Sequence, residues 1–312
     1  MPQFTSSGIM DRWSATDLLD KEIDVIFMQR NETDSTIVLG QYFDTENKDS
    51  GLSHIIGSMT SQLSLPPINE DGEPMPFFTA APGFKKTFLL YGRRMGVQVT
   101  DTMMKAQHHK RITEMVSGQM KAANRKDEYA RASIFNNAFT GTDGADSKPL
   151  CDDSHPHENK DRGTWDNKIT GALTGGNLQA ARLLGRKIDD PQGDPDPLRA
   201  MDVVVPEDLE QKALELTQSA NTAENMLNTK TVLIGKLKPV VSVYLGTASS
   251  VQWFLMGDRT GYAKGLHEIV LIPWNIKDMN PGDPDIVIQK RIKSVREIGF
   301  TVSKNMIGST GS

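Results

Sequence analysis

Cysteine is almost absent from this sequence: Cys151 is the only one among 312 residues. A single cysteine cannot form a disulfide within the chain, which favours folding in a reducing compartment. Long apolar runs are missing too, and no segment approaches the ~20 residues that a membrane helix needs. Because the N-terminus has no basic segment followed by an apolar one, we expect no signal peptide. The sequence excludes a disulfide-built scaffold and predicts no contact with a membrane.

Positive charge is slightly outnumbered by negative charge. Lys and Arg total 35 against 40 Asp and Glu, which gives a formal net charge of -5. This balance argues against a protein that coats nucleic acid with its whole surface, although it allows a local basic patch. Catalytic signatures are lacking as well: there is no G-x-S-x-G elbow, no Walker loop and no G-x-G-x-x-G after a strand. We therefore predict no enzyme, no catalytic residue and no cofactor.

One polar loop holds side chains that could bind a metal. Cys151, His155 and His157 lie close together in the sequence, among the carboxylates of Asp152, Asp153 and Glu158. A structural zinc site usually needs four ligands in two closely spaced pairs, and this loop has a single cysteine. We predict a solvated polar loop without a metal. A metal-dependent hydrolase that uses His155 and His157 with nearby carboxylates is the alternative.

The N-terminal part of the chain predicts an arm followed by a long hairpin. Residues 14–30 are amphipathic at helical spacing, and residues 35–44, STIVLGQYFD, are typical of a strand. Residues 45–84 are rich in proline and glycine and carry an Asp-Gly pair, which favours an extended β-hairpin. Excursions of this length are usually functional. Strand-like alternation follows, with its apolar positions at Phe88, Leu90, Val97 and Val99.

The pattern changes to a helical period at Asp101. Apolar side chains recur at helical spacing to about residue 139 without a proline, which predicts one long helix. A second helix is expected over residues 176–189, and a third after Pro206, with Glu207 and Asp208 in its first turn. Strand-like runs follow at residues 231–235, 239–246, 251–257, 268–274 and 285–303. The order predicts an α+β fold with a β-rich C-terminal third.

An ordered series of motifs over residues 130–230 resembles one family. The segment IFNNAF, residues 134–139, ends the long helix, and Pro149-Leu150 and Ser154-His155-Pro156 follow it. The motif NKITGAL, residues 167–173, precedes the next helix, and Val204-Val205-Pro206 leads to Leu209 and Ala213. This series is similar to that of the major head subunits of tailed phages, especially the Mu-like group.

The resemblance implies the Hong Kong 97 phage-type major capsid fold, with an N-terminal arm, an E-loop hairpin, a spine helix, a peripheral domain and an axial domain. We expect the arm at residues 1–35 and the hairpin with its flanking strands at 36–100. The peripheral domain, with the spine helix and a connector loop, is expected at 101–165. The axial domain follows at 166–270, and residues 271–312 return to the peripheral domain.

The function that the resemblance implies is a major capsid protein, which assembles with itself as pentamers and hexamers into an icosahedral head around DNA. A separate scaffolding protein is implied, since few residues precede the predicted spine. A portal is a second implied partner, and a decoration protein is an optional third. The implied location is the virion, after synthesis in the cytoplasm of the bacterial host. Another phage structural protein, a tail or decoration subunit, is the alternative within this class.

The tip of the predicted E-loop supplies the residues that we expect at contacts between subunits: Leu65, Pro66, Pro67, Glu70, Asp71, Phe77 and Phe78. One branch of the family joins an E-loop lysine to an asparagine of a neighbouring subunit. No lysine occurs between residues 49 and 84 of this chain. We therefore expect a shell that is held by non-covalent contacts.

Overall fold

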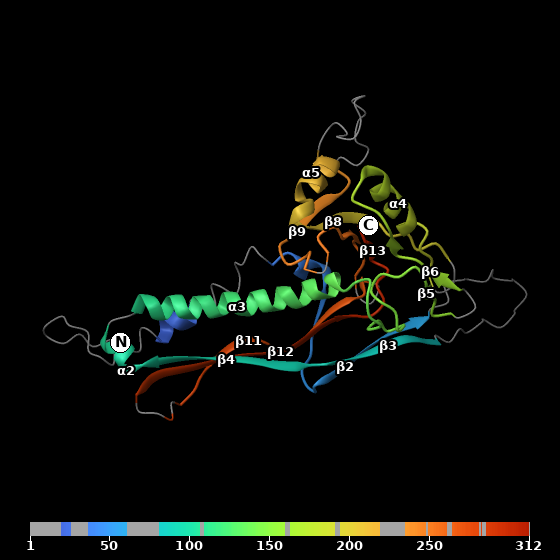
Figure 1. The fold of residues 1–312 in the computed structure, drawn as a ribbon. Helices are drawn as coiled ribbons and strands as arrows, with labels where there is room; N and C mark the ends of the chain where they lie inside the picture. Colours follow the sequence, from blue (N-terminus) through green and yellow to red (C-terminus); the bar gives the residue numbers. More distant parts are fainter. Residues whose placement is uncertain are drawn as a thin grey trace, which may run out of the picture.

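The computed structural model combines α-helices and β-strands in two connected halves (Figure 1). It describes residues 20–25, 37–60, 81–106, 109–159, 163–190, 194–218, 235–247, 249–260, 264–280, 282 and 285–311. Within these ranges, no helix has the length and apolar character that crossing a membrane requires. The framework is a four-stranded sheet, a five-stranded sheet, one long helix and an extended hairpin.

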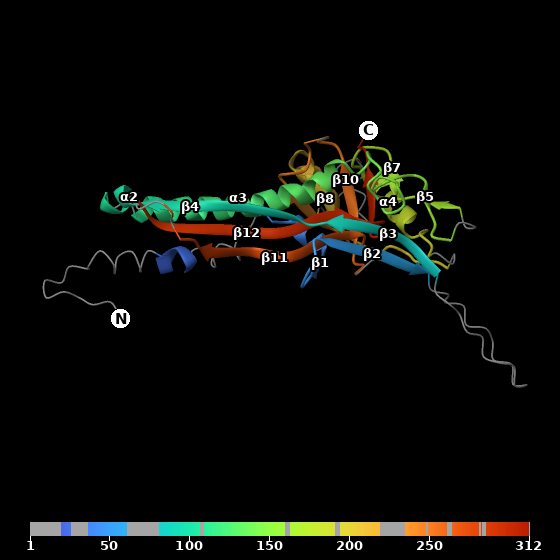
Figure 2. The same ribbon diagram turned by 90° about the horizontal axis from the view of Figure 1, so that it is seen from below.

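The four-stranded sheet and helix α3 (His109–Asn136) form the elongated half of the molecule (Figures 1 and 2). The strand order is β1 (Asp44–Asn47), β11 (Leu266–Asp278), β12 (Ile286–Phe300) and β4 (Tyr91–Thr100). The β1 strand is parallel to β11, and the other pairs are antiparallel. Ile112 and Met120 of α3 share a core with Val97, Val99 and Ile292 of the sheet. The helical period of α3 and the alternation of β4 therefore meet in one apolar layer.

The five-stranded sheet forms the second half. Its order is β7 (Lys168–Ile169), β13 (Met306–Ser309), β10 (Trp253–Gly257), β8 (Ala200–Pro206) and β9 (Lys238–Ser242). Helices α4 (Gly175–Gly185) and α5 (Glu210–Gln218) place Leu178 and Leu216 in one core with Val203 of β8. Val204 lies in a different core, together with Phe135 at the end of α3. Because successive residues of a strand face opposite sides, β8 joins the two halves.

A hairpin of β2 (Ser53–Thr60) and β3 (Ala81–Leu89) extends away from the junction of the two halves (Figure 2). The strands are antiparallel, with Ser53 opposite Leu89. At the base of the hairpin, Ile56 and Phe88 share a small core with Ile269 of β11. A second, shorter hairpin pairs β5 (His155–Pro156) with β6 (Thr164–Trp165).

The strand predicted over residues 35–44 is wrong. Residues Leu39–Tyr42 form the 3-10 turn η1, and β1 begins at Asp44. Leu39 and Tyr42 are both buried. A helical turn places residues three apart on one side, whereas a strand would place them on opposite sides.

The single long helix predicted from Asp101 is wrong in its extent. The chain first forms the short helix α2 (Asp101–Lys105), whose N-terminus is capped by the hydroxyl of Thr100. An Asp101–Lys105 ion pair at 2.5 Å spans this helix, which ends at Ala106, and α3 starts at His109. The helices predicted over residues 176–189 and after Pro206 are present as α4 and as α5, which follows the 3-10 turn η3 (Glu207–Leu209). Strand β13 was not predicted.

Candidate functional site

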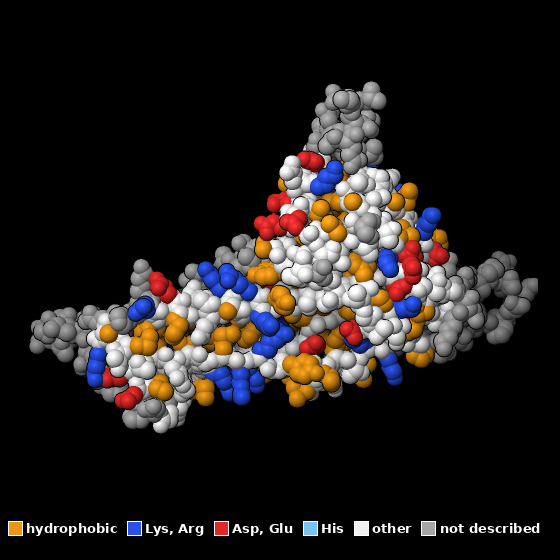
Figure 3. Space-filling view, viewed as in Figure 1, with side chains coloured by type: hydrophobic (Ala, Val, Ile, Leu, Met, Phe, Trp, Pro, Cys, Tyr) orange, Lys and Arg blue, Asp and Glu red, His pale blue; other side chains and the backbone are white. Residues whose placement is uncertain are grey.

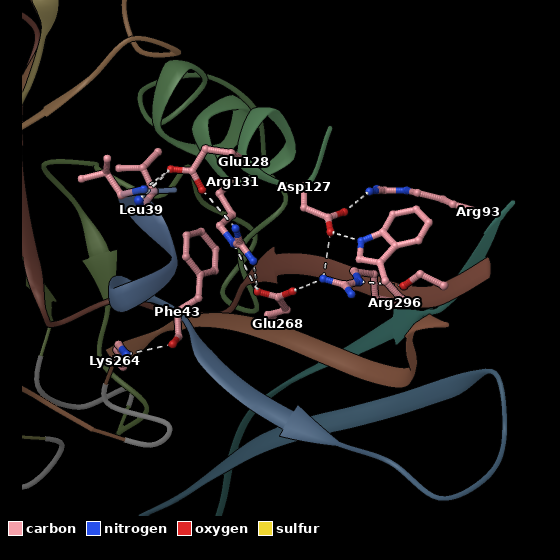
Figure 4. Close-up of polar contacts among 12 residues, drawn as sticks. Leu39, Phe43, Arg93, Asp127, Glu128, Arg131, Lys264, Glu268 and Arg296 are labelled. Atoms are coloured by element: carbon pink, nitrogen blue, oxygen red, sulfur yellow. Dashed lines mark hydrogen bonds and ion pairs between the residues drawn. The ribbon is translucent and has the colours of Figure 1, made fainter. Parts of the chain in front are cut away.

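Six charged side chains meet between α3 and the four-stranded sheet (Figure 4). They are Asp127, Glu128 and Arg131 of α3, Arg93 of β4, Glu268 of β11 and Arg296 of β12. We call these six residues the charge junction. All of them except Arg93 are at most 8% exposed. Three acids and three arginines balance, so the group carries no net charge.

Two carboxylates bridge the arginines of the charge junction. Glu268 accepts from Arg131 at 2.7 Å through one oxygen and from Arg296 at 2.9 Å through the other. Asp127 lies 2.9 Å from Arg93 and 2.9 Å from Arg296. Arg296 thus pairs with both carboxylates, which links one turn of α3 to three strands.

An aromatic side chain closes one side of the charge junction. The indole N–H of Trp274 donates to Asp127 at 2.6 Å. The guanidinium of Arg296 lies over the Trp274 ring, 5.6 Å from its centroid. Its Nε atom donates to the hydroxyl of Ser294 at 2.8 Å. These contacts satisfy buried polar atoms that would be costly without partners.

The charge junction also holds the segment that precedes β1. Glu128 accepts from the backbone N–H groups of Val38 at 2.9 Å and Leu39 at 2.7 Å, and from Arg131 at 3.0 Å. On the other side of this segment, Lys264 donates to the carbonyl of Phe43 at 2.9 Å. The segment before β1 is therefore fixed to α3 by a buried carboxylate.

Burial and the neighbouring carboxylates shift the pKa of Arg131 in opposite directions. Burial disfavours the charged form of Arg131, but Glu268 and Glu128 outweigh that effect and raise the pKa of Arg131 above its usual value. Removing one member of such a group leaves an uncompensated buried charge, which is strongly destabilising. The three carboxylates of the charge junction are held by buried arginine, indole and backbone donors. Its geometry therefore fixes the position of α3 relative to the sheet and to the N-terminal segment.

The prediction of a solvated loop is wrong for its potential metal ligands, because Cys151, His155 and His157 are all buried. Cys151 has no exposed surface, and its backbone N–H donates to the carbonyl of Ala138 at 2.8 Å. Burial raises the pKa of its thiol far above the usual value, which makes Cys151 a packing residue rather than a nucleophile. The carboxamide of Asn167 donates to the carbonyls of Leu150 at 3.0 Å and Ser303 at 3.3 Å. The loop connects the end of α3 to the five-stranded sheet.

The two histidines of this loop are buried as well. The Nδ1 atom of His155 lies 2.6 Å from a carboxylate oxygen of Asp146, and its ring stacks on Trp165 at a centroid distance of 4.6 Å. The backbone N–H of His157 donates to the carbonyl of Gly163 at 3.1 Å. The structure does not bring Cys151, His155 and His157 together as a metal site.

A different set of ligand-type side chains does converge. In the part of the chain that the structure describes, the group with atoms within 4.8 Å of one another is Asp44, Glu46 and His267. It lies across the pair β1 and β11. The Nε2 atom of His267 is 3.0 Å from the hydroxyl of Thr301, and Glu46 pairs with His54 at 2.8 Å. Two of the three side chains are thus used in contacts with other residues.

All of the predicted subunit-contact residues lie outside the described residues: Leu65, Pro66, Pro67, Glu70, Asp71, Phe77 and Phe78. The base of the same hairpin is described, and it presents apolar side chains to solvent. Ile55 is 64% exposed and Leu89 is 55% exposed, and Tyr91, at the start of the adjoining strand β4, is 60% exposed. Ile55 and Leu89 share one side of the strand pair, because Ser53 lies opposite Leu89 and Ile55 is two residues further along.

The sequence analysis missed the charge junction. Its signal is present in α3, where Asp127 and Arg131 continue the buried stripe of Met120 and Ala123 at helical spacing. Charged residues on a buried helix face imply partners of opposite charge. The partners Glu268 and Arg296 could not be identified, because they come from strands far away in the sequence.

Comparisons with known proteins agree with the fold. The capsid of the cyanophage P-SCSP1u has a TM-score of 0.56 at 11% identity, covering 86% of this chain and 86% of that chain. A virus-like particle from Pyrococcus furiosus has a TM-score of 0.53 at 8% identity, covering 93% and 98%. The capsid of Myoviridae phage XM1 has a TM-score of 0.53 at 11% identity, covering 90% and 93%. At these identities the likeness concerns the fold. No curated protein sequence matches the chain.

A family model described as phage capsid protein matches residues 95–298, which is more than half of the chain. The matched part runs from β4 through α3 and both halves of the molecule to the end of β12. It contains the charge junction with the exception of Arg93, and the α+β architecture is that of the Hong Kong-type capsid fold. Membership of the Mu-like group stays a prediction. The chain belongs to the phage capsid protein family.

Proposed function

We propose that this chain assembles with itself as pentamers and hexamers into the icosahedral head that encloses the DNA of a tailed phage. Its role is structural, and the charge junction, whose carboxylates are held by buried donors, serves to position elements. The exposed apolar side chains at the base of the hairpin carry this proposal. Apolar patches on a protein surface mark sites of interaction with other molecules.

The exposed apolar face of the hairpin base includes Ile55 and Leu89. Ile55 and Leu89 project from the side opposite Ile56 and Phe88, which anchor the base to the sheet. A two-stranded hairpin is at best marginally stable alone, so a face of this kind requires a partner surface. In a shell of identical subunits, the partner is a neighbouring copy.

The division of the molecule into two halves supports a proposal for its domains. We propose that the five-stranded sheet with α4 and α5 is the axial domain, and that α3 with the four-stranded sheet is the peripheral domain. The predicted boundaries were residues 101–165, 166–270 and 271–312. Strand β13 lies within the last range yet pairs with β10 and β7, so we propose that residues 306–309 belong to the axial domain.

The remaining partners follow from this role. We propose a separate scaffolding protein during assembly and a portal in the finished head, with a decoration protein as an additional partner. The protein is made in the cytoplasm of the bacterial host and resides in the virion. The formal net charge of -5 suits a shell that surrounds DNA without gripping it.

The test is size-exclusion chromatography and negative-stain electron microscopy of the expressed chain, alone and together with its scaffolding protein. We expect closed shells. Ile55→Ser with Leu89→Ser should lower the particle yield but not the melting temperature, whereas Tyr129→Ser, at an exposed position of α3, should leave both unchanged. Tubes would indicate a tail subunit, and a chain that stays monomeric at high concentration with its scaffold would refute the proposal.

A further inference from the structure

A basic pocket lies where α4 ends and β8 begins. The cavity has a volume of about 530 Å³ and is lined by Arg182, Arg186, Leu198, Arg199, Met201 and Lys236. Arg186, Arg199 and Lys236 are exposed, and Arg182 is half-buried. None of these four cations has an ion-pair partner among the residues that the structure describes.

Local roles do not account for this concentration of charge. Arg182 lies in the last turn of α4, and Arg186 is the C-cap residue of this helix. Cations at the C-terminus of a helix interact favourably with the helix dipole. Arg199 comes instead from the segment before β8, and Lys236 from the segment before β9. Three separate segments thus bring four like charges to one hollow. Because these charges repel one another, the pocket is suited to an anionic group.

The same half of the molecule carries a group of three exposed carboxylates. Glu207, Asp208 and Glu210 are exposed at the beginning of η3 and α5, and Figure 3 shows acidic side chains gathered over α5. No described cation forms an ion pair with these three carboxylates. Acidic side chains at the N-terminus of a helix interact favourably with the helix dipole, but a single turn does not require three exposed acids for that purpose.

The pocket and the acids lie at opposite ends of β8. The strand runs from Ala200, beside the pocket, to Pro206, which directly precedes the acids. Its 7 residues span about 20 Å at ~3.3 Å per residue. The acids of one copy therefore cannot reach the pocket of the same copy.

We propose that the carboxylates of Glu207, Asp208 and Glu210 bind in the basic pocket of a neighbouring copy of this chain. The inference rests on the proposed function, because it concerns the contact between subunits in one capsomer. Two different and complementary patches on one subunit are what a head-to-tail contact within a ring requires. Such a charge pair sets the orientation of the neighbour and rejects wrong arrangements.

DNA phosphates are the competing anion for this pocket. The second copy is favoured because each subunit carries one pocket and one acidic group, so every pocket in a ring is filled. Proteins that bind nucleic acid usually carry an extended basic stripe or patch. The four cations of this chain instead line a hollow.

The test uses charge reversal in two places and a matched control. The pocket variant is Arg186→Glu with Arg199→Glu and Lys236→Glu, which makes the charge of the pocket negative. The acid variant is Glu207→Lys with Glu210→Lys, and all five positions are exposed. The control is Lys121→Glu with Arg125→Glu, at exposed positions of α3. Each of the first two should lower the yield of particles by about tenfold or more, because like charges then face each other. The control should assemble as the wild type does.

Combining the reversals sharpens the result. One chain that carries all five reversals should regain assembly, since a negative pocket then faces a positive group in every contact. Mixing the pocket variant with the acid variant should restore only rings in which they alternate, so hexamers form and pentamers do not. In wild-type particles, a zero-length carbodiimide crosslinker should join Lys236 to Glu207, Asp208 or Glu210 of another copy.

The outcomes separate this inference from the proposed function. If the wild type forms no particles even with its scaffold, the proposed function fails. If the wild type assembles and the two reversal variants match it, or if the control is impaired as strongly as they are, the inference is refuted. Unchanged shells with less packaged DNA in the pocket variant would also refute it, in favour of phosphates. Circular dichroism and melting curves establish that each variant folds.

Discussion

The carboxylates of Asp127, Glu128 and Glu268 each accept from more than one donor, and all three are almost completely buried. A buried ion pair contributes little net stability, because desolvation offsets the attraction. The penalty for breaking such a pair is much larger than its net contribution. The charge junction therefore determines which arrangement of α3 and the sheet is permitted, more than how stable that arrangement is.

Removing Arg131 should be strongly destabilising, since Glu268 and Glu128 then lose a buried partner. We expect Arg131→Ala to lower the free energy of unfolding by about 3–5 kcal/mol. Arg125→Ala, at an exposed position of the same helix, should change it by about 0.5 kcal/mol or less. Urea unfolding of the subunit measures both. Equal effects of the two substitutions would show that the charge junction is not needed.

His267 should make the stability sensitive to acid. Burial lowers the pKa of His267, and Glu46 and Asp44 only partly oppose this effect. In the unfolded chain the pKa of a histidine is about 6.5. Above that pH the ring of His267 is neutral in both the folded and the unfolded state, so its titration does not change the stability. As the pH falls below that value, the unfolded chain takes up a proton first, and stability decreases until the folded pKa is reached.

His267→Gln removes this titration. The variant will be less stable than the wild type at pH 7.5, because His267 is buried. The difference between the two should become smaller at pH 5.5, with a slope of at most about 1.4 kcal/mol per pH unit. Urea unfolding at several pH values tests this. A difference that does not change with pH contradicts it.

At the scale of elements, the hairpin and the core are separable. The base of β2 and β3 is held by Ile56, Phe88 and Leu90. Strand pairing continues to the last described residues, Thr60 opposite Ala81. The tip beyond them was predicted from the sequence to contact neighbouring subunits rather than its own core.

Deleting residues 61–80 and closing the hairpin with an Asn-Gly turn should leave a folded subunit that cannot assemble. Its base keeps every described apolar contact, so the circular dichroism spectrum and the melting temperature should stay close to those of the wild type. Electron microscopy should show no shells. If folding is lost together with assembly, the tip belongs to the core, and if assembly survives, the tip is not a contact.

At the scale of the whole molecule, the lysines nearest the hairpin tip are held at its base. Lys48 donates to the carbonyl of Ser53, and Lys86 donates to the carbonyl of Asp143. Lys86 also lies over the ring of Phe300, 4.7 Å from its centroid. Lys85 pairs with Gly57, well before the end of the strand. None of these amines lies at the reaching end of the loop.

Mature particles should therefore contain no covalent crosslinks between subunits. Boiling them in detergent is expected to release a single band at the monomer mass of 34.5 kDa. The physical reason is the absence of a lysine between residues 49 and 84, which leaves no amine to form an isopeptide bond. A ladder of multimers that survives a reducing agent would show that another lysine reaches a neighbour.

The periodic elements could be predicted because their signal is local. The stripe of Leu178, Ala181 and Ile188 and the alternation of Phe88 and Leu90 determine which face of each element is buried, and all five side chains are buried in the structure. The absence of cysteine pairs and of lysine in the hairpin likewise follows from composition alone. Such features depend on spacing of a few residues, which the sequence displays directly.

Long-range contacts were decided only by the tertiary structure. Arg131 and Glu268 are 137 positions apart in the sequence. The local sequence around either residue gives no indication that the other is its partner. The same holds for the burial of Cys151 beneath β13, and for the four cations that three separate segments bring to one pocket. The sequence by itself determined most of the helices and strands and the family, since these rest on neighbouring residues. The packing of distant strands decided which charges face one another, because that depends on the path of the whole chain.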